Sequence, residues 1–197
     1  MLKVAITGNI ASGKSQVEKI LLSLGHKVAD TDKINHFILS SDSSAISEIK
    51  EAFSFDDILD DNGAISRSKL GNVVFSDIQK KRKLEKILHK RINKKVDEFF
   101  EENKNEKIVF IAIPLLFETN QQNKFDKIIF ISSDENIRVK RLIERNNYSL
   151  EYAKTRIASQ DKEFDKIKKS DFVIYNNSDL VNLKKQVNDI LNHLISH

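Results

Sequence analysis

A short stretch near the start of the chain has the residue types and spacing needed to hold a phosphate chain. Residues 8–15 read GNIASGKS, which fits the pattern G-x-x-x-x-G-K-[ST]. An apolar run, residues 2–7, precedes this stretch, and an amphipathic run, residues 16–24, follows it. A buried strand that ends in such a turn directs backbone N–H groups at a phosphate chain, beside the positive end of the next helix. The sequence therefore predicts a site for a nucleoside triphosphate.

Two side chains of this stretch supply chemistry that the backbone lacks. Lys14 would add a point charge near the β and γ phosphates, and Ser15 would offer a hydroxyl to Mg²⁺. Motor ATPases, switch GTPases and small-molecule kinases share such a loop, so the loop alone does not decide the reaction.

Two carboxylates follow the second predicted strand, in the segment Val28-Ala29-Asp30-Thr31-Asp32. On an extended segment, side chains at i and i+2 point the same way, so both carboxylates are expected in the crevice beside the γ phosphate. Phosphoryl transfer to an alcohol needs the hydroxyl oriented and its proton accepted, which one aspartate would do while the other supports metal-bound water or orientation. The alternative is that Asp32 only caps a helix that begins near Lys33.

The elements that must position these residues alternate between short apolar runs and longer helical patterns, as a parallel α/β sheet requires. The predicted strands are residues 2–7, 27–30, 107–113, 127–132 and 172–175. The predicted helices between and after them are residues 16–24, 135–146, 150–160 and 179–195. Residues 33 to about 100 are almost wholly helical in pattern, with one long helix near the end of that span. The fold class is therefore predicted as α/β, a P-loop NTPase fold with a five-stranded parallel sheet, flanking helices and a helical insertion.

Composition limits the class of protein further. The 197 residues, 40% of them hydrophobic, suit one domain. The absence of a signal peptide and of a long apolar stretch favours the cytoplasm over a membrane, and the absence of cysteine excludes a disulfide framework. The 33 basic residues are interleaved with 29 acidic ones and lysine far outnumbers arginine, which argues against a nucleic-acid partner. No obligate protein partner is predicted either.

Several motifs together resemble the dephospho-CoA kinase family. They are the phosphate loop, VADTD at 28–32, NGAISR at 62–67, residues 84–92, PLLFE at 114–118, Arg141 with Arg145, Arg156 with Gln160, and residues 171–176. They follow the family's order and cover nearly the whole chain. The resemblance implies transfer of the ATP γ phosphate to the ribose 3′-hydroxyl of dephospho-CoA with Mg²⁺, giving coenzyme A and ADP in the last step of coenzyme A biosynthesis.

The resemblance also implies roles for individual residues. The ATP site would comprise Gly8, Ala11, Ser12, Gly13, Lys14, Ser15, Gln16, Arg145 and Asn176. Asp32 would be the base, with Asp30 as its companion and with Ser15 as a partner at the metal. Arg141 and Arg145 would be lid arginines that neutralise the transferring phosphoryl group or lie against the adenine, unless they only form salt bridges to Glu144 or Glu135.

The same resemblance divides the chain into a single kinase domain with three parts. The core would be residues 1–32 and 105–197, the CoA-binding insertion about 33–104, and the lid about 138–168. Arg67, His89 and Leu115 would contact the substrate, although His89 could equally satisfy a local hydrogen bond on its helix.

Three positions depart from the family pattern. Gln16 stands where Thr or Ser is usual, and Lys90 stands where a proline is common, which predicts an uninterrupted helix there. The third strand has no acidic residue directly before Pro114, so metal would depend on Ser15, ATP oxygens, water and the aspartates, with Glu118 as a possible contributor.

Two other classes of protein share part of this pattern. Residues 123–126 (NKFD) and 60–63 (DDNG) have the spelling of GTPase elements, but neither follows a buried strand, as those elements do in a switch GTPase. Another small-molecule or nucleoside monophosphate kinase is the remaining alternative.

Overall fold

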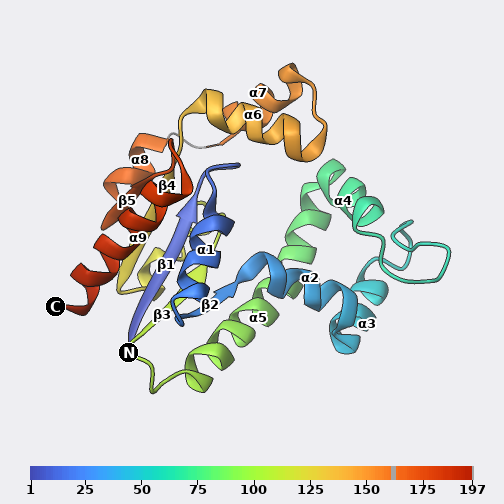
Figure 1. Cartoon of the computed structure of the whole chain (residues 1–197). Coiled ribbons are helices and arrows are strands. Elements are labelled where there is room, and N and C mark those ends of the chain that lie inside the picture. The colour runs from blue at the N-terminus through green and yellow to red at the C-terminus, as the bar shows by residue number, and fades with distance from the viewer. Residues whose placement is uncertain (161–162, 197) are drawn as a thin grey trace. The chain divides into compact units, whose positions relative to one another are not determined.

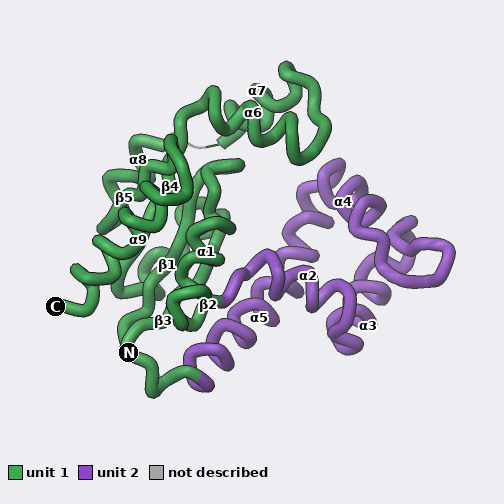
Figure 2. The backbone as a smooth tube through the Cα atoms, in the orientation of Figure 1, with its two compact units in different colours: residues 1–28, 103–197 green, residues 29–102 purple. Residues whose placement is uncertain are grey.

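The computed structural model describes residues 1–160 and 163–196, and the chain divides into two compact units (Figure 2). The first unit is Met1–Val28 with Asn103–His197, and the second is Ala29–Glu102.

A five-stranded sheet has the order β2-β3-β1-β4-β5 (Figure 1), and all of it except the last two residues of β2 belongs to the first unit. The strands are β1 Leu2–Gly8, β2 Lys27–Asp30, β3 Ile108–Ala112, β4 Lys127–Ser132 and β5 Phe172–Tyr175. β1 pairs in parallel with β3 and β4, and β4 pairs in parallel with β5. Every residue of β3 is buried, as expected of a parallel strand covered on both faces. The predicted α/β fold class is confirmed.

Helices of the first unit pack on this sheet and extend from it. α1 Lys14–Ser23 and α9 Leu180–Ile195 pack against each other and share one apolar core with β1, β3, β4 and β5. α6 Glu135–Asn146 and α7 Leu150–Ala158 form a hairpin with a separate core of Val139, Leu142, Ala153 and Ile157. A one-turn 3₁₀ helix, η1 Gln122–Lys124, precedes β4.

The second unit consists of four helices around their own core. They are α2 Thr31–Ser41, α3 Ser43–Ala52, α4 Arg67–Ser76 and α5 Ile78–Glu102. α5 contacts the other three helices and runs through Lys90 without interruption, as predicted. Its buried side chains are Leu84, Ile87, Leu88, Val96 and Phe100.

Three details of the secondary structure differ from prediction. Residues 53–66, between α3 and α4, form turns with an isolated bridge between Leu59 and Ile65 instead of continuing the predicted helical span. The helix after β2 begins at Thr31 rather than near Lys33, because Asp30 already caps it. A six-residue helix, α8 Glu163–Lys168, lies where no helix was predicted. Its sequence, EFDKIK, is too short and too polar to give an apolar helical pattern.

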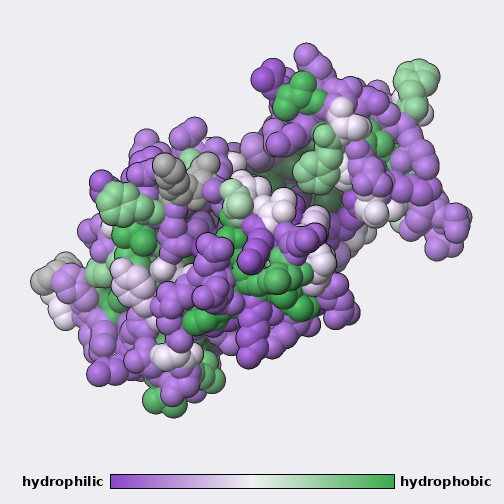
Figure 3. Space-filling view, turned by 90° about the horizontal axis from the view of Figure 1, so that it is seen from above, coloured by the Kyte–Doolittle hydropathy of each residue, from purple (hydrophilic) through white to green (hydrophobic). Residues whose placement is uncertain are grey.

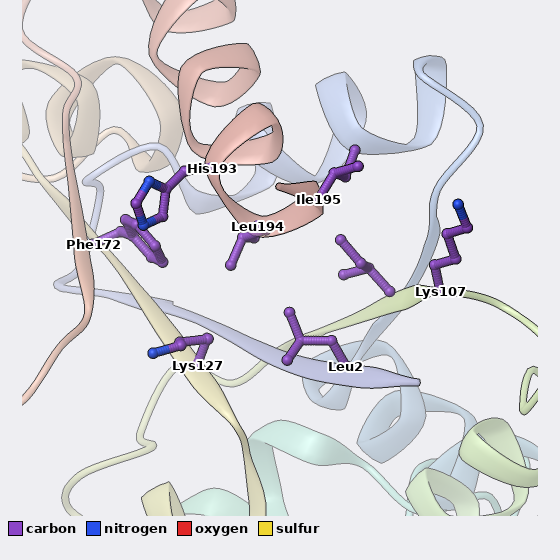
Figure 4. A pocket seen from close by; sticks show the side chains of 8 residues that line it. Leu2, Lys107, Lys127, Phe172, His193, Leu194 and Ile195 are labelled. Atoms are coloured by element: carbon purple, nitrogen blue, oxygen red, sulfur yellow. The ribbon is translucent and has the colours of Figure 1, made fainter. Parts of the chain in front are cut away.

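On the face drawn in Figure 3, hydrophobic residues lie in separate groups among many hydrophilic ones. No helix in the described part of the chain is long and apolar enough to cross a membrane. A pocket of about 400 Å³ lies where β1, β3, β4 and β5 begin, closed by the end of α9 (Figure 4). Leu2, Ile108, Phe172, Leu194 and Ile195 give it a mostly apolar lining. Because it lies at the amino ends of the strands, it is at the opposite edge of the sheet from Gly8.

Candidate active site

The phosphate loop joins the end of β1 to the start of α1, and close packing explains both of its glycines. A Cβ atom on Gly8 would lie 2.6 Å from both the Ile131 carbonyl oxygen and Ser12 Oγ. Gly13 has a φ of +99°, and a Cβ atom there would lie 2.0 Å from Asn176 Nδ2. The motif therefore needs glycine at these two positions because the backbone passes so near its neighbours.

The loop presents donors suited to an anion. Gly13 is the N-cap residue of α1, and neither a side-chain cap nor an acidic residue of the first turn neutralises that helix end. The first N–H groups of a helix have no partner within the helix, and they carry its positive partial charge. Ser12 Oγ is buried and has no hydrogen-bond partner among residues 1–160 and 163–196. Phosphate oxygens would satisfy these groups.

Lys14 is held by a buried acid within α1. Its Nζ lies 3.0 Å from Glu18 Oε1, and Glu18 is only 2% exposed. Sequence reasoning missed Glu18, although its position four residues after Lys14 places it on the same helix face.

Arg141 of α6 binds carbonyl oxygens of the phosphate loop. Its Nη1 donates to the carbonyl oxygens of Ala11 and Ser12, each at 3.2 Å, and to Ser133 Oγ at 3.2 Å. Burial lowers the pKa of the Arg141 guanidinium from its ordinary value. Ala11 has a φ of 60°, which is unfavourable for a residue with a side chain, and the Arg141 contact helps to hold it. The structure brings this predicted site residue to the loop backbone.

Asn176, directly after β5, also reaches the loop. Its side-chain Nδ2 donates to the Ser12 backbone carbonyl oxygen at 2.8 Å. The backbone carbonyl oxygen of Asn176 accepts from Arg141 Nη2 at 3.1 Å. Arg145, in contrast, is exposed near the end of α6 and donates to Asn146 Oδ1 at 2.9 Å. The structure thus brings Arg141 and Asn176, but not Arg145, into contact with the phosphate loop.

The remaining predicted residues of the first unit lie around the loop and after β3. Ser15 and Gln16 are exposed in the first turn of α1. Leu115 is 49% exposed after β3. Glu118, considered above as a contributor to a metal site, accepts from Lys166 Nζ at 2.5 Å.

The two candidate aspartates lie at the start of the second unit, and the predicted geometry between them is wrong. Asp30 is extended, but Asp32 is already in α2, so the two do not alternate along one strand. Asp30 Oδ1 accepts from the Asp32 backbone N–H at 2.9 Å and is therefore the helix cap. Asp32 stands exposed in the first turn. The helix cap is thus Asp30, and the alternative prediction that Asp32 caps this helix is wrong.

The predicted substrate contacts of the second unit come from two helices. Arg67 is the first residue of α4, and its Nη1 lies 3.0 Å from Nδ1 of His36 in α2. Sequence reasoning missed His36, because it comes to Arg67 only through tertiary structure, in which α2 and α4 both pack on α5. His89 is exposed on α5.

Among the residues that the structure describes, no group of three or more His, Cys, Asp or Glu side chains could hold a metal ion.

Comparison with known proteins gives consistent results. A family model for dephospho-CoA kinase matches residues 2–182. A dephospho-CoA kinase of Fusobacterium nucleatum is 41% identical over 184 residues, covering 93% of this chain and 94% of that one. A dephospho-CoA kinase of Listeria innocua is 36% identical over 198 residues, 98% of each chain. The structure of a dephospho-CoA kinase from Campylobacter jejuni matches with a TM-score of 0.71 at 32% identity, covering 98% of this chain and 96% of that one.

Proposed function

The chain belongs to the dephospho-CoA kinase family, and on this basis we propose that it transfers the γ-phosphoryl group of ATP to the ribose 3′-hydroxyl of dephospho-CoA. The products are coenzyme A and ADP, and the step completes coenzyme A biosynthesis. The observation that carries the proposal is the uncapped amino end of α1 beside the unpartnered, buried Ser12 hydroxyl, since both await an anion. The reaction takes place in the cytoplasm and needs neither nucleic acid, a membrane nor an obligate protein partner.

ATP binds with its phosphates along residues 11–16. Lys14 leaves Glu18 and places its ammonium on the β and γ phosphates, where it stabilises the charge that develops during transfer. Arg141 and Asn176 hold the carbonyl side of the loop, so that the opposite N–H side faces the phosphates.

Mg²⁺ fits this site because it keeps several water ligands and is held largely by phosphate oxygens. Ser15, exposed at the start of α1, would supply one hydroxyl, and Asp32, also exposed, would be a further ligand through water. When bound, the ion neutralises charge on the transferred group.

Asp32 accepts the proton of the ribose hydroxyl. The strand order supports this assignment, because β2 belongs to the same sheet as β1, Asp30 is the last residue of β2 and Asp32 follows it. Asp30 fixes the start of α2 by capping it and thereby orients Asp32, the second residue of that helix.

Dephospho-CoA binds to the helical unit through its anionic groups. The Arg67 guanidinium, next to His36, is the candidate partner for a phosphate of the substrate. His89 and Leu115 are further candidate contacts, and both are exposed.

Substrate choice is tested by a coupled ADP-release assay in which dephospho-CoA is offered beside nucleoside monophosphates, shikimate and pantothenate. We expect ADP release when dephospho-CoA is the acceptor and none with the other acceptors. Turnover of a nucleoside monophosphate or shikimate in its place would assign the chain to another small-molecule kinase activity.

The base is tested with Asp32→Asn. We expect kcat to fall by roughly 10²- to 10⁴-fold while the Kd for ATP changes little, because the residue acts on the acceptor hydroxyl. Asp30→Asn is the matched control, since asparagine keeps the helix cap, and it should retain most activity. An Asp32→Asn variant that lost ATP binding but kept its turnover would refute the assignment.

A further inference from the structure

The phosphate loop is also held on a side that the proposed mechanism does not use. Asn9 is 5% exposed, and its side-chain amide makes two hydrogen bonds to α8. Its Nδ2 donates to Glu163 Oε2 at 3.1 Å, and its Oδ1 accepts from Lys166 Nζ at 3.1 Å. An amide has a donor side and an acceptor side, so an acid and a base three residues apart on one helix face fix its orientation.

Glu163 and Lys166 are in turn hydrogen-bonded to residues at or after the ends of two strands. Glu163 Oε1 accepts from Ser132 Oγ at the end of β4. Lys166, only 5% exposed, also donates to Glu118 after β3 at 2.5 Å. A buried charge with several hydrogen-bond partners is costly to displace, so α8 is a rigid reference for Asn9.

The next loop residue is held by the same part of the chain. The Ile10 N–H donates to Gln160 Oε1 at 2.7 Å, and Gln160 lies just after α7. Ala11, which follows, has the unfavourable φ of 60°. A strained backbone conformation persists only where surrounding contacts hold it in place. The contacts of Asn9 and Ile10 hold the backbone before Ala11, and Arg141 holds the Ala11 carbonyl oxygen.

We propose that Glu163 and Lys166 are positioning residues that set the shape of the phosphate loop through the Asn9 amide. Their effect falls on ATP binding, because they touch neither the reacting atoms nor the acceptor. The inference rests on the proposed function, since it assigns the loop to ATP.

The test exchanges the amide and the carboxylate. Asn9→Asp places two carboxylates in contact, and we expect the KM for ATP to rise about tenfold or more, while kcat at saturating ATP falls less than about threefold. Adding Glu163→Gln restores one donor and one acceptor in reversed order, with the Lys166 contact retained. The buried Arg138 guanidinium, 3.5 Å from Glu163 Oε2 in the parent, exchanges that carboxylate for the one introduced at position 9. The double variant should therefore return the KM for ATP to within about threefold of the parent value.

Controls separate positioning from loss of folding. Lys127→Met removes a lysine from another ion pair of the same unit, at 3.0 Å from Asp171, and should leave the KM for ATP unchanged. Circular dichroism melting verifies that each variant is folded, and Asn9→Ala, which removes the amide but keeps the Lys166–Glu118 pair, replaces Asn9→Asp if the latter does not fold.

The outcomes are distinct. The positioning role would be overturned if the double variant had the same KM for ATP as Asn9→Asp alone. It would also be overturned if Asn9→Asp or Asn9→Ala kept the parent KM for ATP. Should the parent protein itself fail to phosphorylate dephospho-CoA, the proposed function falls, whereas calorimetric titration of ATP would still test the effect of α8 on the loop.

Discussion

At the scale of single residues, the phosphate site is defined as much by what holds the loop as by what it binds. The carbonyl oxygen of Ser12 accepts from both Arg141 and Asn176, and Asn176 itself occupies the space that a Gly13 side chain would need. These contacts cost no reorganisation when a phosphate arrives, because the loop is already formed.

Lys14 is the exception, since it must change partner. Glu18 is buried and competes with phosphate for the Lys14 ammonium. We expect Glu18→Gln to lower the Kd for a non-hydrolysable ATP analogue by about three- to tenfold in isothermal titration, because a neutral amide competes less well for the ammonium.

Glu144→Gln provides the control for this substitution. Glu144 has the same spacing from Lys140 on α6, with 3.9 Å between Nζ and Oε1, but lies away from the loop and should have no effect. Weaker binding by Glu18→Gln would mean that Glu18 orients Lys14 toward the phosphates instead of competing with them.

At the scale of the elements, helix caps decide where the second unit places its side chains. Asp30 caps α2, Asp42 caps α3 and Ser66 caps α4. Asp42 Oδ1 accepts from the Ala45 N–H at 3.0 Å and from Ser44 Oγ at 2.7 Å. The Ala45 bond first, and then the Ser44 bond, hold the pKa of Asp42 below its ordinary value.

This shift predicts a pH dependence of stability. A depressed carboxylate pKa means that folding favours the ionised form, so the stabilisation is present above the ordinary pKa of about 3.9 and is lost as pH falls through the depressed pKa. In urea unfolding followed by circular dichroism from about pH 5 downward, Asp42→Asn should show a shallower loss of unfolding free energy than the parent.

Asp61→Asn serves as the comparison, because Asp61 lies on an exposed turn between α3 and α4. The prediction fails if Asp42→Asn and Asp61→Asn follow the same pH dependence.

The elements also show what sequence could and could not predict. The strands of the sheet and α6 were predicted nearly to the residue, because buried parallel strands are unbroken apolar runs and α6 has a regular apolar stripe. The pairing of Asp30 with Asp32 was misjudged because the cap starts α2 two residues earlier than the apolar pattern suggests. The contacts of Asn9 with α8 join residues more than 150 positions apart, and no local pattern encodes them.

At the scale of the whole molecule, the chain has two units with separate cores, and the proposed phosphate contacts belong to the first. A ligand that binds only the folded protein stabilises it by about 2.7 kcal/mol at a hundredfold excess over its Kd. For a chain of this size we expect ATP at that excess to raise the Tm of the first unit by roughly 5–10 °C in differential scanning calorimetry.

Lys14→Ala should remove most of this increase, because it takes away the charge that meets the β and γ phosphates. An unchanged Tm for the parent at saturating ATP, or an equal increase for Lys14→Ala, would contradict the assignment of the loop as the nucleotide site.

The pocket where the strands begin has a practical consequence. Leu2, at the start of β1, and Ile195, at the end of α9, both line it, so the two ends of the described backbone meet there. β1 then runs about 20 Å to reach the phosphate loop. A larger side chain at Leu2 or Ile195 would therefore disturb packing where the sheet begins, at a distance from the catalytic edge, and would change stability before it changed phosphoryl transfer.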